Sequence, residues 1–299
     1  MREKILVTGA NGQLGMELQQ LAAGYPGFDF VFTTREQLPL DDLNALDRFI
    51  SEHKPQYCIN CAAYTAVDKA ESEMELAFRI NAEAPGIMAA SCKTNNIQFI
   101  HVSTDYVFNG NGSAPFKEDD KTDPVNLYGA SKLEGETMVM KSDPKSIIIR
   151  TGWVYSEFGK NFVKTMLRLM GEREQISVVS DQYGTPTYAA DLADAIMKII
   201  SSVQDPAQHS QTTAQKGIFH FSNQGQISWY DFAVAIRDLI GSSCRVNPIS
   251  TSEYPTPAKR PAYSVLDKSK ISNTFNIQIK DWKASLAVCL GKIKTAQNN

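Results

Sequence analysis

The stretch KILVTGANGQLGMELQQL, residues 4–21, decides the fold of the amino-terminal half of the chain. Residues 4–8 are a short, mostly apolar run typical of a buried strand, and residues 16–21 have apolar side chains at helical spacing. The glycines within residues 9–15 allow a tight turn, close approach of the backbone to a pyrophosphate, and close packing of helix on strand. A glycine triplet alone is a weak signal. Placed between a strand and a helix, it predicts a dinucleotide-binding loop with phosphates at the helix amino terminus.

Strand-like and helix-like segments alternate beyond this loop. Strands are expected at residues 28–32, 57–63, 99–103 and 147–150, and helices at 43–50, 81–90, 161–170 and 191–197. The alternation predicts an α/β fold, a Rossmann-type doubly wound parallel sheet, over residues 1–151. Beyond it the alternation becomes irregular, so most of residues 152–299 are expected to form a smaller carboxyl-terminal substrate-binding subdomain. Residues 218–222 alternate like a strand and are a candidate to return to the sheet, whereas residues 201–216 are expected to be a polar loop.

The loop after the second strand bears on the choice of cofactor. An NAD-preferring site usually places an acidic side chain there, against the ribose hydroxyls, whereas residues 33–35 are Thr-Thr-Arg. Arg35 can pair with a 2'-phosphate, which favours NADPH with NADH tolerated, although Glu36 follows it and weakens this preference. The alternative is that Arg35 is a solvated loop charge. Leu40 and Asp41 are candidates for contact with the adenine end.

Two loops are expected to supply the remaining cofactor contacts. The strand expected at 57–63 runs into small side chains, which let the backbone lie against a flat ligand. Val67, a little further on, is placed to touch a substrate. The candidate cofactor contacts from the two loops are Gly9, Asn11, Gly12, Gln13, Leu14, Ala62, Ala63, Tyr64 and Thr65.

Polar side chains follow the strand expected at 99–103. Ser103, Thr104 and Asp105 stand at its carboxyl end, where doubly wound sheets place their chemistry. A hydroxyl there can donate to a substrate carbonyl and stabilise the charge that develops on its oxygen. The alternative is a strand cap that only satisfies backbone groups.

The stretch YGASK, residues 128–132, is the candidate for proton transfer. It opens a helix expected over residues 131–136, so Tyr128 and Lys132 are four residues apart and share one face. A free phenol titrates near pH ~10, and a neighbouring cation lowers its pKa towards working pH, which suits carbonyl chemistry. A surface Tyr and Lys on an ordinary helix is the alternative, and the other motifs disfavour it.

Taken together, these residues resemble the extended short-chain dehydrogenase/reductases that act on nucleotide sugars and, among them, the dTDP-4-dehydrorhamnose reductase family. With the glycine loop, the matching stretches run in order through the first two-thirds of the chain. They are AAYTAVDKAE (62–71), STDYVF (103–108), YGASKLEGE (128–136), RTGWVY (150–155) and DQYGTPT (181–187). Several long matches are more specific than any single motif.

The resemblance implies that hydride passes from NAD(P)H to the C4 ketone of dTDP-4-dehydro-6-deoxy-L-mannose, giving dTDP-L-rhamnose for surface polysaccharide. Tyr128 would protonate the alkoxide, and Lys132 would hold the nicotinamide ribose and lower the pKa of Tyr128. Thr104 would hydrogen-bond the substrate oxygen, and Trp153 would pack against the sugar. Apart from the resemblance, Arg260 lies in a proline-rich loop and is a candidate for the substrate diphosphate, with an exposed loop arginine as the alternative.

Two departures from related enzymes matter. Similar sugar-nucleotide dehydratases carry a Glu directly after the Thr-Asp pair, as a base for a ring proton. This chain has Tyr106 there, which disfavours dehydration and favours simple reduction. In some family members glutamates bind magnesium at a dimer interface; Glu17 is present here, but the other two aligned positions hold Ala190 and Lys292. The resemblance therefore gives no metal site, and a monomer or weak homodimer is expected.

Composition and charge limit the other classes of partner. The 299 residues carry a net charge of -3 without a basic stripe or tail, so neither nucleic acid nor an anionic membrane is an expected partner. No stretch approaches ~20 apolar residues and the amino terminus enters a strand directly, so a cytoplasmic location is expected. The five scattered cysteines disfavour a disulfide framework, and the four isolated histidines predict no zinc site.

Two other functions stay open at this point. A regulatory subunit of methionine adenosyltransferase resembles the same stretches, and a non-catalytic regulator could keep Tyr128, Lys132 and Thr104. A reductase of another nucleotide-linked keto sugar is the second, because the sequence does not specify the nucleobase or the sugar stereochemistry.

Overall fold

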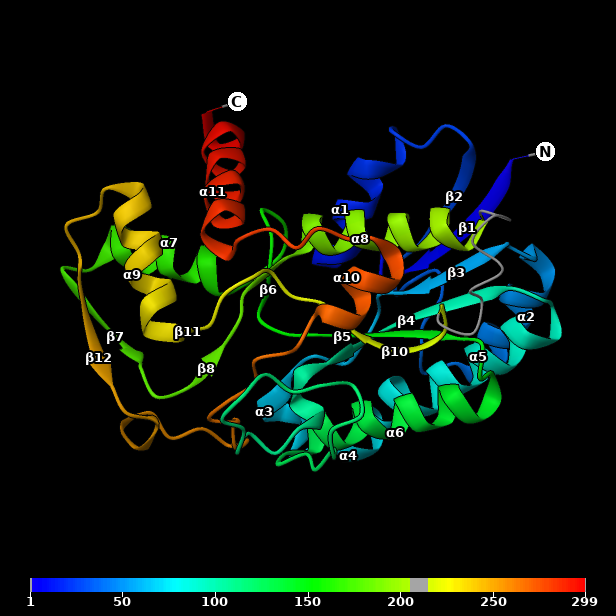
Figure 1. Ribbon diagram of the computed structural model, residues 1–299, viewed down its shortest axis with the longest axis horizontal. Coiled ribbons are helices and arrows are strands. Elements are labelled where there is room, and N and C mark those ends of the chain that lie inside the picture. Colours follow the sequence, from blue (N-terminus) through cyan, green and yellow to red (C-terminus); the bar gives the residue numbers. More distant parts are fainter. Residues whose placement is uncertain (1, 205–214, 299) are drawn as a thin grey trace.

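The central element of the molecule is a six-stranded parallel sheet (Figure 1). In the computed structural model, which describes residues 2–204 and 215–298, the expected strand and helix around the glycine loop are β1 (Glu3–Thr8) and α1 (Gln13–Ala22). The strand order is β10-β5-β4-β3-β1-β2, and every neighbouring pair is parallel. The other strands are β2 (Phe28–Thr33), β3 (Tyr57–Asn60), β4 (Gln98–Thr104), β5 (Ile147–Thr151) and β10 (Gly217–His220).

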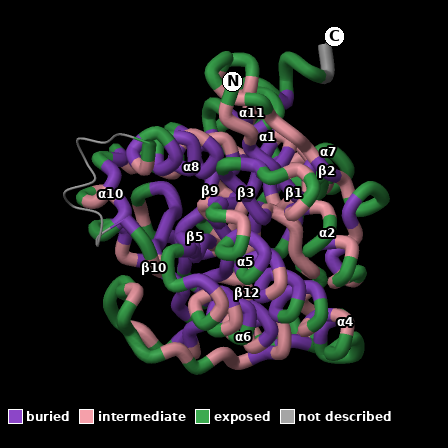
Figure 2. Tube along the Cα trace, turned by 90° about the vertical axis from the view of Figure 1, so that its right-hand side faces the viewer, coloured by how far each residue is buried: buried purple, intermediate pink, exposed green. Residues whose placement is uncertain are grey.

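Helices cover both faces of this sheet, which confirms the predicted Rossmann-type α/β fold. One face carries α1, α8 (Ala189–Gln204) and α10 (Ser269–Phe275). The other carries α2 (Leu43–His53), α5 (Ala84–Thr94) and α6 (Leu127–Ser142). Because both faces are covered, β3 and β5 are buried along their whole length, and Figure 2 shows the buried residues gathered around the central strands. None of the helices in the described ranges is both long and apolar enough to cross a membrane.

The second half of the chain contributes to this sheet and also forms a separate cluster. β10 pairs with β5 from Gly217 opposite Ile147 to His220 opposite Arg150, so the candidate strand does return to the sheet. The remaining elements lie to one side of the sheet in Figure 1 and surround a second hydrophobic core or pair with its strands. They are β6 (Val154–Tyr155), α7 (Phe162–Glu172), β7 (Gln175–Val179), β8 (Tyr183–Gly184), β9 (Thr187–Tyr188), β11 (Ile227–Ser228), α9 (Trp229–Ile240), β12 (Arg245–Ile249), a 3₁₀ turn (Thr251–Glu253) and α11 (Trp282–Asn298).

Side-chain caps explain where two helices begin. Gly129 N–H donates to Asn126 Oδ1 at 2.7 Å, so α6 begins at Leu127, earlier than the expected residue 131. Ser228 and Asp231 form a capping box at the start of α9. The early start of α6 places Tyr128 in its first turn.

Two expected boundaries along the chain are wrong. β3 ends at Asn60 rather than at residue 63, because residues 61–65 leave the sheet and line a cavity. α8 continues to Gln204, so the loop expected at 201–216 begins as helix. Residues 205–214 of that loop lie outside the described residues.

The helix expected to begin at Asn81 begins earlier in the chain, and Asn81 lies inside it. α4 (Met74–Phe78), a π-helical turn (Arg79–Glu83) and α5 follow one another without a break. The Asn81 side chain accepts from Tyr64 N–H at 2.9 Å and donates to Ser131 Oγ at 3.0 Å. It therefore ties the loop after β3 to α6.

Candidate active site

A cavity of about 1120 Å³ opens at the carboxyl ends of the parallel strands. It is lined by the loops that follow β1, β2, β3, β4 and β5 and by the beginnings of α1 and α6. This edge of the sheet is where doubly wound folds bind their ligands. The sequence-predicted residues that line it are Gly9, Asn11, Gly12, Gln13, Leu14, Arg35, Leu40, Asp41, Ala62, Ala63, Tyr64, Thr65, Val67, Ser103, Thr104, Asp105, Tyr128, Lys132 and Trp153.

The glycine loop leaves little room for larger side chains. Gly9 has a φ of +71°, and a Cβ there would lie 2.8 Å from the Ala62 backbone nitrogen. A Cβ on Gly15 would lie 2.3 Å from the Gly9 carbonyl oxygen, so α1 packs directly against the loop. Gly12 is the N-cap of α1 and lines the cavity, so the first backbone N–H groups of the helix open towards it. These residues fit the diphosphate of a dinucleotide.

Tyr128 and Lys132 lie one turn apart on α6 and both line the cavity. Burial raises the pKa of Tyr128 to about 12, with a side-chain hydrogen bond between Tyr128 and Thr104 lowering it and the Asp105 charge raising it. The net direction is opposite to the expected one, because burial is the largest cause and Lys132 Nζ is directed at the Val102 carbonyl, at 2.7 Å. Burial also lowers the pKa of Lys132, to about 8.

Thr104 caps a turn and also lines the cavity. Its Oγ1 accepts from Tyr106 N–H at 3.2 Å and so caps a 3₁₀ turn, Asp105–Val107. The same hydroxyl lies in the cavity lining and interacts with Tyr128. Burial raises the pKa of Asp105, which accepts from Thr104 Oγ1 at 3.1 Å, to about 6.

Ser103 lines the cavity, but its hydroxyl proton is already used. Ser103 Oγ donates to Glu136 Oε1 at 2.6 Å, and Arg150 Nη2 lies 2.7 Å from Glu136 Oε2. Neither side chain of this ion pair is more than 3% exposed. The interaction anchors α6 to β4 and β5, so Ser103 contributes to the structure as well as to the cavity wall.

An aromatic pair, Trp153 and Trp229, forms part of the cavity wall. Trp153, with a φ of +51°, stacks on Trp229 at a ring-centroid distance of 3.5 Å. A Cβ on Gly184 would lie 2.6 Å from the Trp153 ring, which explains the glycine there. Trp229 could not be predicted as a cavity residue, because nothing in its local sequence pattern separates a cavity residue from a core aromatic. Lys160, a cation in the same lining, was not predicted either.

Arg260 is not among the residues that line the cavity. Its Nη1 and Nη2 lie 2.9 and 2.8 Å from the two carboxylate oxygens of Asp68. Asp68 belongs to α3 (Val67–Ala70), directly after Val67, so the pair joins the carboxyl-terminal loop to the rim of the cavity. The positive charge of Arg260 is therefore balanced by the Asp68 carboxylate.

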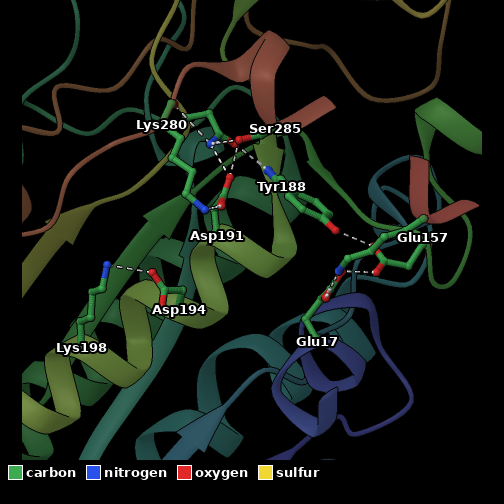
Figure 3. Close-up of polar contacts among 10 residues, drawn as sticks. Glu17, Glu157, Tyr188, Asp191, Asp194, Lys198, Lys280 and Ser285 are labelled. Atoms are coloured by element: carbon green, nitrogen blue, oxygen red, sulfur yellow. Dashed lines mark hydrogen bonds and ion pairs between the residues drawn. The ribbon is translucent and has the colours of Figure 1, made fainter. Parts of the chain in front are cut away.

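Glu17, which the resemblance associates with magnesium, is buried and is not among the residues that line the cavity. Figure 3 shows it close to Glu157. Ser156 Oγ donates to Glu17 at 2.7 Å, and burial raises the pKa of Glu17 to about 7. Lys292 Nζ lies 2.8 Å from Glu157 Oε1 and 3.9 Å from Glu17 Oε2, so an ammonium group supplies the nearby positive charge. Among the described residues, no group of three or more His, Cys, Asp and Glu side chains is placed to hold a metal ion.

Comparison with known proteins agrees with this arrangement. A family model described as RmlD substrate binding domain matches residues 3–295. A dTDP-4-dehydrorhamnose reductase of Burkholderia thailandensis is 42% identical over 295 residues, which cover 96% of this chain and 98% of that protein. The crystal structure of a dTDP-4-dehydrorhamnose reductase from Clostridium acetobutylicum, 41% identical, has a TM-score of 0.90 and covers 97% of this chain and 99% of its own.

A second solved structure was obtained with a ligand. It is a Bacillus anthracis dTDP-4-dehydrorhamnose reductase in complex with NADP, 37% identical, with a TM-score of 0.91 and coverage of 98% of this chain and 100% of its own. The family model and these relatives each span nearly the whole chain. With the same folded scaffold and a cavity lined by the family's motifs, this chain belongs to the dTDP-4-dehydrorhamnose reductase family.

Proposed function

We propose that this protein is an NADPH-dependent reductase of the C4 ketone of dTDP-4-dehydro-6-deoxy-L-mannose, which yields dTDP-L-rhamnose for surface polysaccharide. The observation that carries the proposal is the convergence of Tyr128, Lys132 and Thr104 on one cavity beside the glycine loop. Full-length relatives named dTDP-4-dehydrorhamnose reductase support the choice of substrate.

The bound cofactor supplies the hydride, and the chain supplies its binding and orientation. The glycine loop and the amino terminus of α1 would hold the diphosphate, Leu40 and Asp41 the adenine end, and Lys132 the nicotinamide ribose. Residues 62–65 would lie along the cofactor. Use of NADPH is supported by the NADP complex of the Bacillus anthracis relative and by Arg35, which lines the cavity. Glu36 lines it too, but residues 33–35, directly after the strand, hold no carboxylate of the kind that NAD-preferring sites place there.

Tyr128 is the proposed proton donor to the oxygen that becomes an alkoxide. With a pKa near 12 it is protonated at neutral pH, yet it is a stronger acid than a sugar alcohol, so the proton moves downhill to the alkoxide. Thr104 would hydrogen-bond the same oxygen, and Trp153 would pack on the sugar ring. Val67, Ser103 and Asp105 would complete this side of the cavity, and Arg260 would exchange Asp68 for the substrate diphosphate.

Tyr106 supports reduction over dehydration. Burial raises its pKa, so the phenol is protonated at neutral pH and cannot take a proton from the sugar ring. Its ring packs edge-on against Tyr128 at a centroid distance of 5.8 Å. We therefore assign it a packing role beside the proton donor.

The remaining assignments extend the same proposal. A monomer or weak homodimer is supported by Lys292, whose ammonium group occupies the surroundings of Glu17 and Glu157. Equal molar mass by light scattering in magnesium and in chelator would agree with this, and a magnesium-dependent dimer would contradict it. We place the enzyme in the cytoplasm, where NADPH and nucleotide sugars are used, and assign residues 1–151 mainly to cofactor binding and 152–299 mainly to substrate binding.

The direct test supplies the purified protein with freshly prepared dTDP-4-dehydro-6-deoxy-L-mannose and NADPH. Loss of the reduced-nicotinamide absorbance and formation of dTDP-L-rhamnose by NMR are expected, with dTDP-4-dehydro-6-deoxy-D-glucose as the control sugar. Faster turnover of a different keto sugar would change the assigned substrate. No oxidation of either NADPH or NADH by any keto sugar would favour the regulatory-subunit alternative.

A further inference from the structure

A buried row of side chains crosses the sheet and ends at Lys132. Thr8 of β1 is in register with Asn60 of β3, and Asn60 is in register with His101 of β4, so the three side chains project from one face. Thr8 Oγ1 donates to Asn60 Oδ1 at 2.7 Å. Asn60 Nδ2 lies 3.1 Å from His101 Nδ1, and His101 Nε2 lies 3.2 Å from Lys132 Nζ. None of the four residues is more than 2% exposed.

The direction of this row is set by a backbone group. Ala62 N–H donates to Asn60 Oδ1 at 3.2 Å, and a backbone N–H cannot act as an acceptor. Asn60 Oδ1 is therefore the acceptor of the amide, and Asn60 Nδ2 must donate to His101 Nδ1. A neutral imidazole carries one ring proton, so that proton lies on Nε2 and faces Lys132.

The neutral state of His101 follows from its surroundings. Burial, and next the charge of Lys132, hold the pKa of His101 well below its ordinary value. An Nε2–H group beside Nζ stabilises the lysine amine, whose lone pair can accept it, and disfavours the ammonium, which can only donate. Lys132 Nζ meanwhile donates to the Val102 carbonyl at 2.7 Å, so its position is held from two sides.

We propose that His101 is a positioning residue that acts through Lys132, and that its Nε2–H favours release of a lysine proton to Tyr128 after each reduction. In this step a Lys132 N–H bond breaks and the O–H bond of the Tyr128 phenolate re-forms, directly or across an intervening hydroxyl. The amine then regains a proton from water. The inference rests on the proposed function only for the role of Tyr128, and the tautomer of His101 can be measured without turnover.

Other groups around Lys132 must be considered in any pH measurement. Glu136, one turn further along α6, favours the charged lysine, but it is paired with Arg150 of β5. The other titratable side chains that line the cavity are Asp41, Cys61, Tyr64, Lys69, Glu73, Asp105, Tyr106, Tyr128, Lys160, Arg35 and Glu36.

The first test is the ring tautomer itself. In ¹⁵N NMR spectra of protein labelled at histidine, the resonances lost on His101→Phe identify this ring among the four histidines. A bare Nδ1 and a protonated Nε2 are expected across neutral pH. A protonated Nδ1, either as the other tautomer or as an imidazolium ion, would overturn the proposal even if the enzyme turns over as expected.

The second test reverses the hydrogen bonds from residue 60 to His101 and Lys132 with a substitution of nearly the same size and shape. In Asn60→Asp the carboxylate would accept from His101 Nδ1, which leaves Nε2 bare and able to accept from the Lys132 ammonium. In steady-state turnover, where Tyr128 must regain its proton in every cycle, we expect the wild-type rate to fall above pH about 8, where Lys132 loses its proton. This alkaline limb should move up by about one pH unit in the variant.

Two controls separate the tautomer from simpler effects. Asn60→Asp combined with His101→Phe keeps the new charge but removes the ring, and its limb should match that of His101→Phe alone. An equal upward shift with and without the ring would show that charge alone sets the lysine pKa and would overturn the proposal. His220→Phe removes the other fully buried histidine of the sheet and should leave the limb in place.

Discussion

Helix α6 presents two polar side chains, one turn apart, to the same sheet, and their surroundings differ. Glu136 accepts from Arg150 Nε at 2.9 Å and from Arg150 Nη2 at 2.7 Å, a closed ion pair outside the cavity lining. Lys132 meets the Val102 carbonyl and the His101 ring, both uncharged, and lines the cavity. A compensated charge holds its proton state and fixes the helix, whereas an incompletely compensated one can exchange a proton during a reaction.

The largest expected effect is on the cavity side of this comparison. Tyr128→Phe should lower kcat by about 10²- to 10⁴-fold with cofactor binding nearly intact, because only the proton donor is lost. Stopped-flow NADPH oxidation and a separate NADPH titration measure the two quantities. The neighbouring Tyr106→Phe is the matched variant and should lose far less, so equal losses in both would remove the distinction between the two phenols.

Replacing Glu136 with a neutral residue should mainly lower stability, whereas replacing Lys132 with one should mainly lower activity. Glu136→Gln leaves the Arg150 guanidinium buried without its counter-ion, which should reduce the free energy of unfolding by about 3–5 kcal/mol. Lys132→Met replaces a buried amine with an apolar side chain of similar volume and should change stability by less than about 1.5 kcal/mol while abolishing turnover. Urea unfolding followed by circular dichroism measures the stability of both variants, and NADPH oxidation measures their turnover. Retained stability in Glu136→Gln would contradict an anchoring role.

Glu17 is intermediate between Glu136 and Lys132 in how far its charge is compensated. It is a buried carboxyl, and Lys292 Nζ lies 3.9 Å from its Oε2. Because burial raises its pKa from 4.5 to about 7, the folded state binds this proton more tightly than the unfolded chain. The corresponding stability is present below pH about 4.5 and is lost as the pH rises through about 7. Glu17→Gln should therefore be more stable than wild type by about 1–3 kcal/mol at pH 8 and close to it at pH 5. A constant difference between the two pH values would show that Glu17 titrates normally.

The smallest effect is expected at the exposed end of the cavity. Arg35 lines it but is solvated, so its pairing with a 2'-phosphate is worth less than a buried contact. Arg35→Ala should raise the Kd for NADPH about tenfold and leave NADH within about twofold. Isothermal titration with both cofactors measures this, and equal losses would assign Arg35 to neither. Glu36→Ala, beside it, is the control and should not weaken NADPH.

Residues with local signals could be predicted from the sequence, and those that depend on strand order could not. The glycine loop, the strand ends at Thr104 and the helical spacing of Tyr128 and Lys132 are all short-range patterns, and all of them line the cavity. The contact between Asn60 and His101 spans 41 positions and exists only because β3 and β4 are neighbours in register.

The surroundings of Trp229 and Arg260 could not be predicted for the same reason. Trp229 lines the cavity and stacks on Trp153, a contact between separate parts of the carboxyl-terminal half. Arg260 pairs with Asp68 across 192 positions, so its local proline-rich context could not reveal a partner. The pKa of Tyr128 was predicted in the wrong direction because its burial, unlike its spacing from Lys132, is a property of the folded molecule.

The position of β10 beside β5 also has a consequence for synthesis on the ribosome. When β5 has emerged, the sheet still lacks its edge strand, and the face that holds Ile147 and Ile149 still lacks α8 and α10. The nascent amino-terminal half therefore exposes an unpaired strand and a broad apolar surface until residue 275 has left the exit tunnel. Translation of the later residues completes the earlier ones, and until then the exposed strand and apolar surface are prone to aggregation.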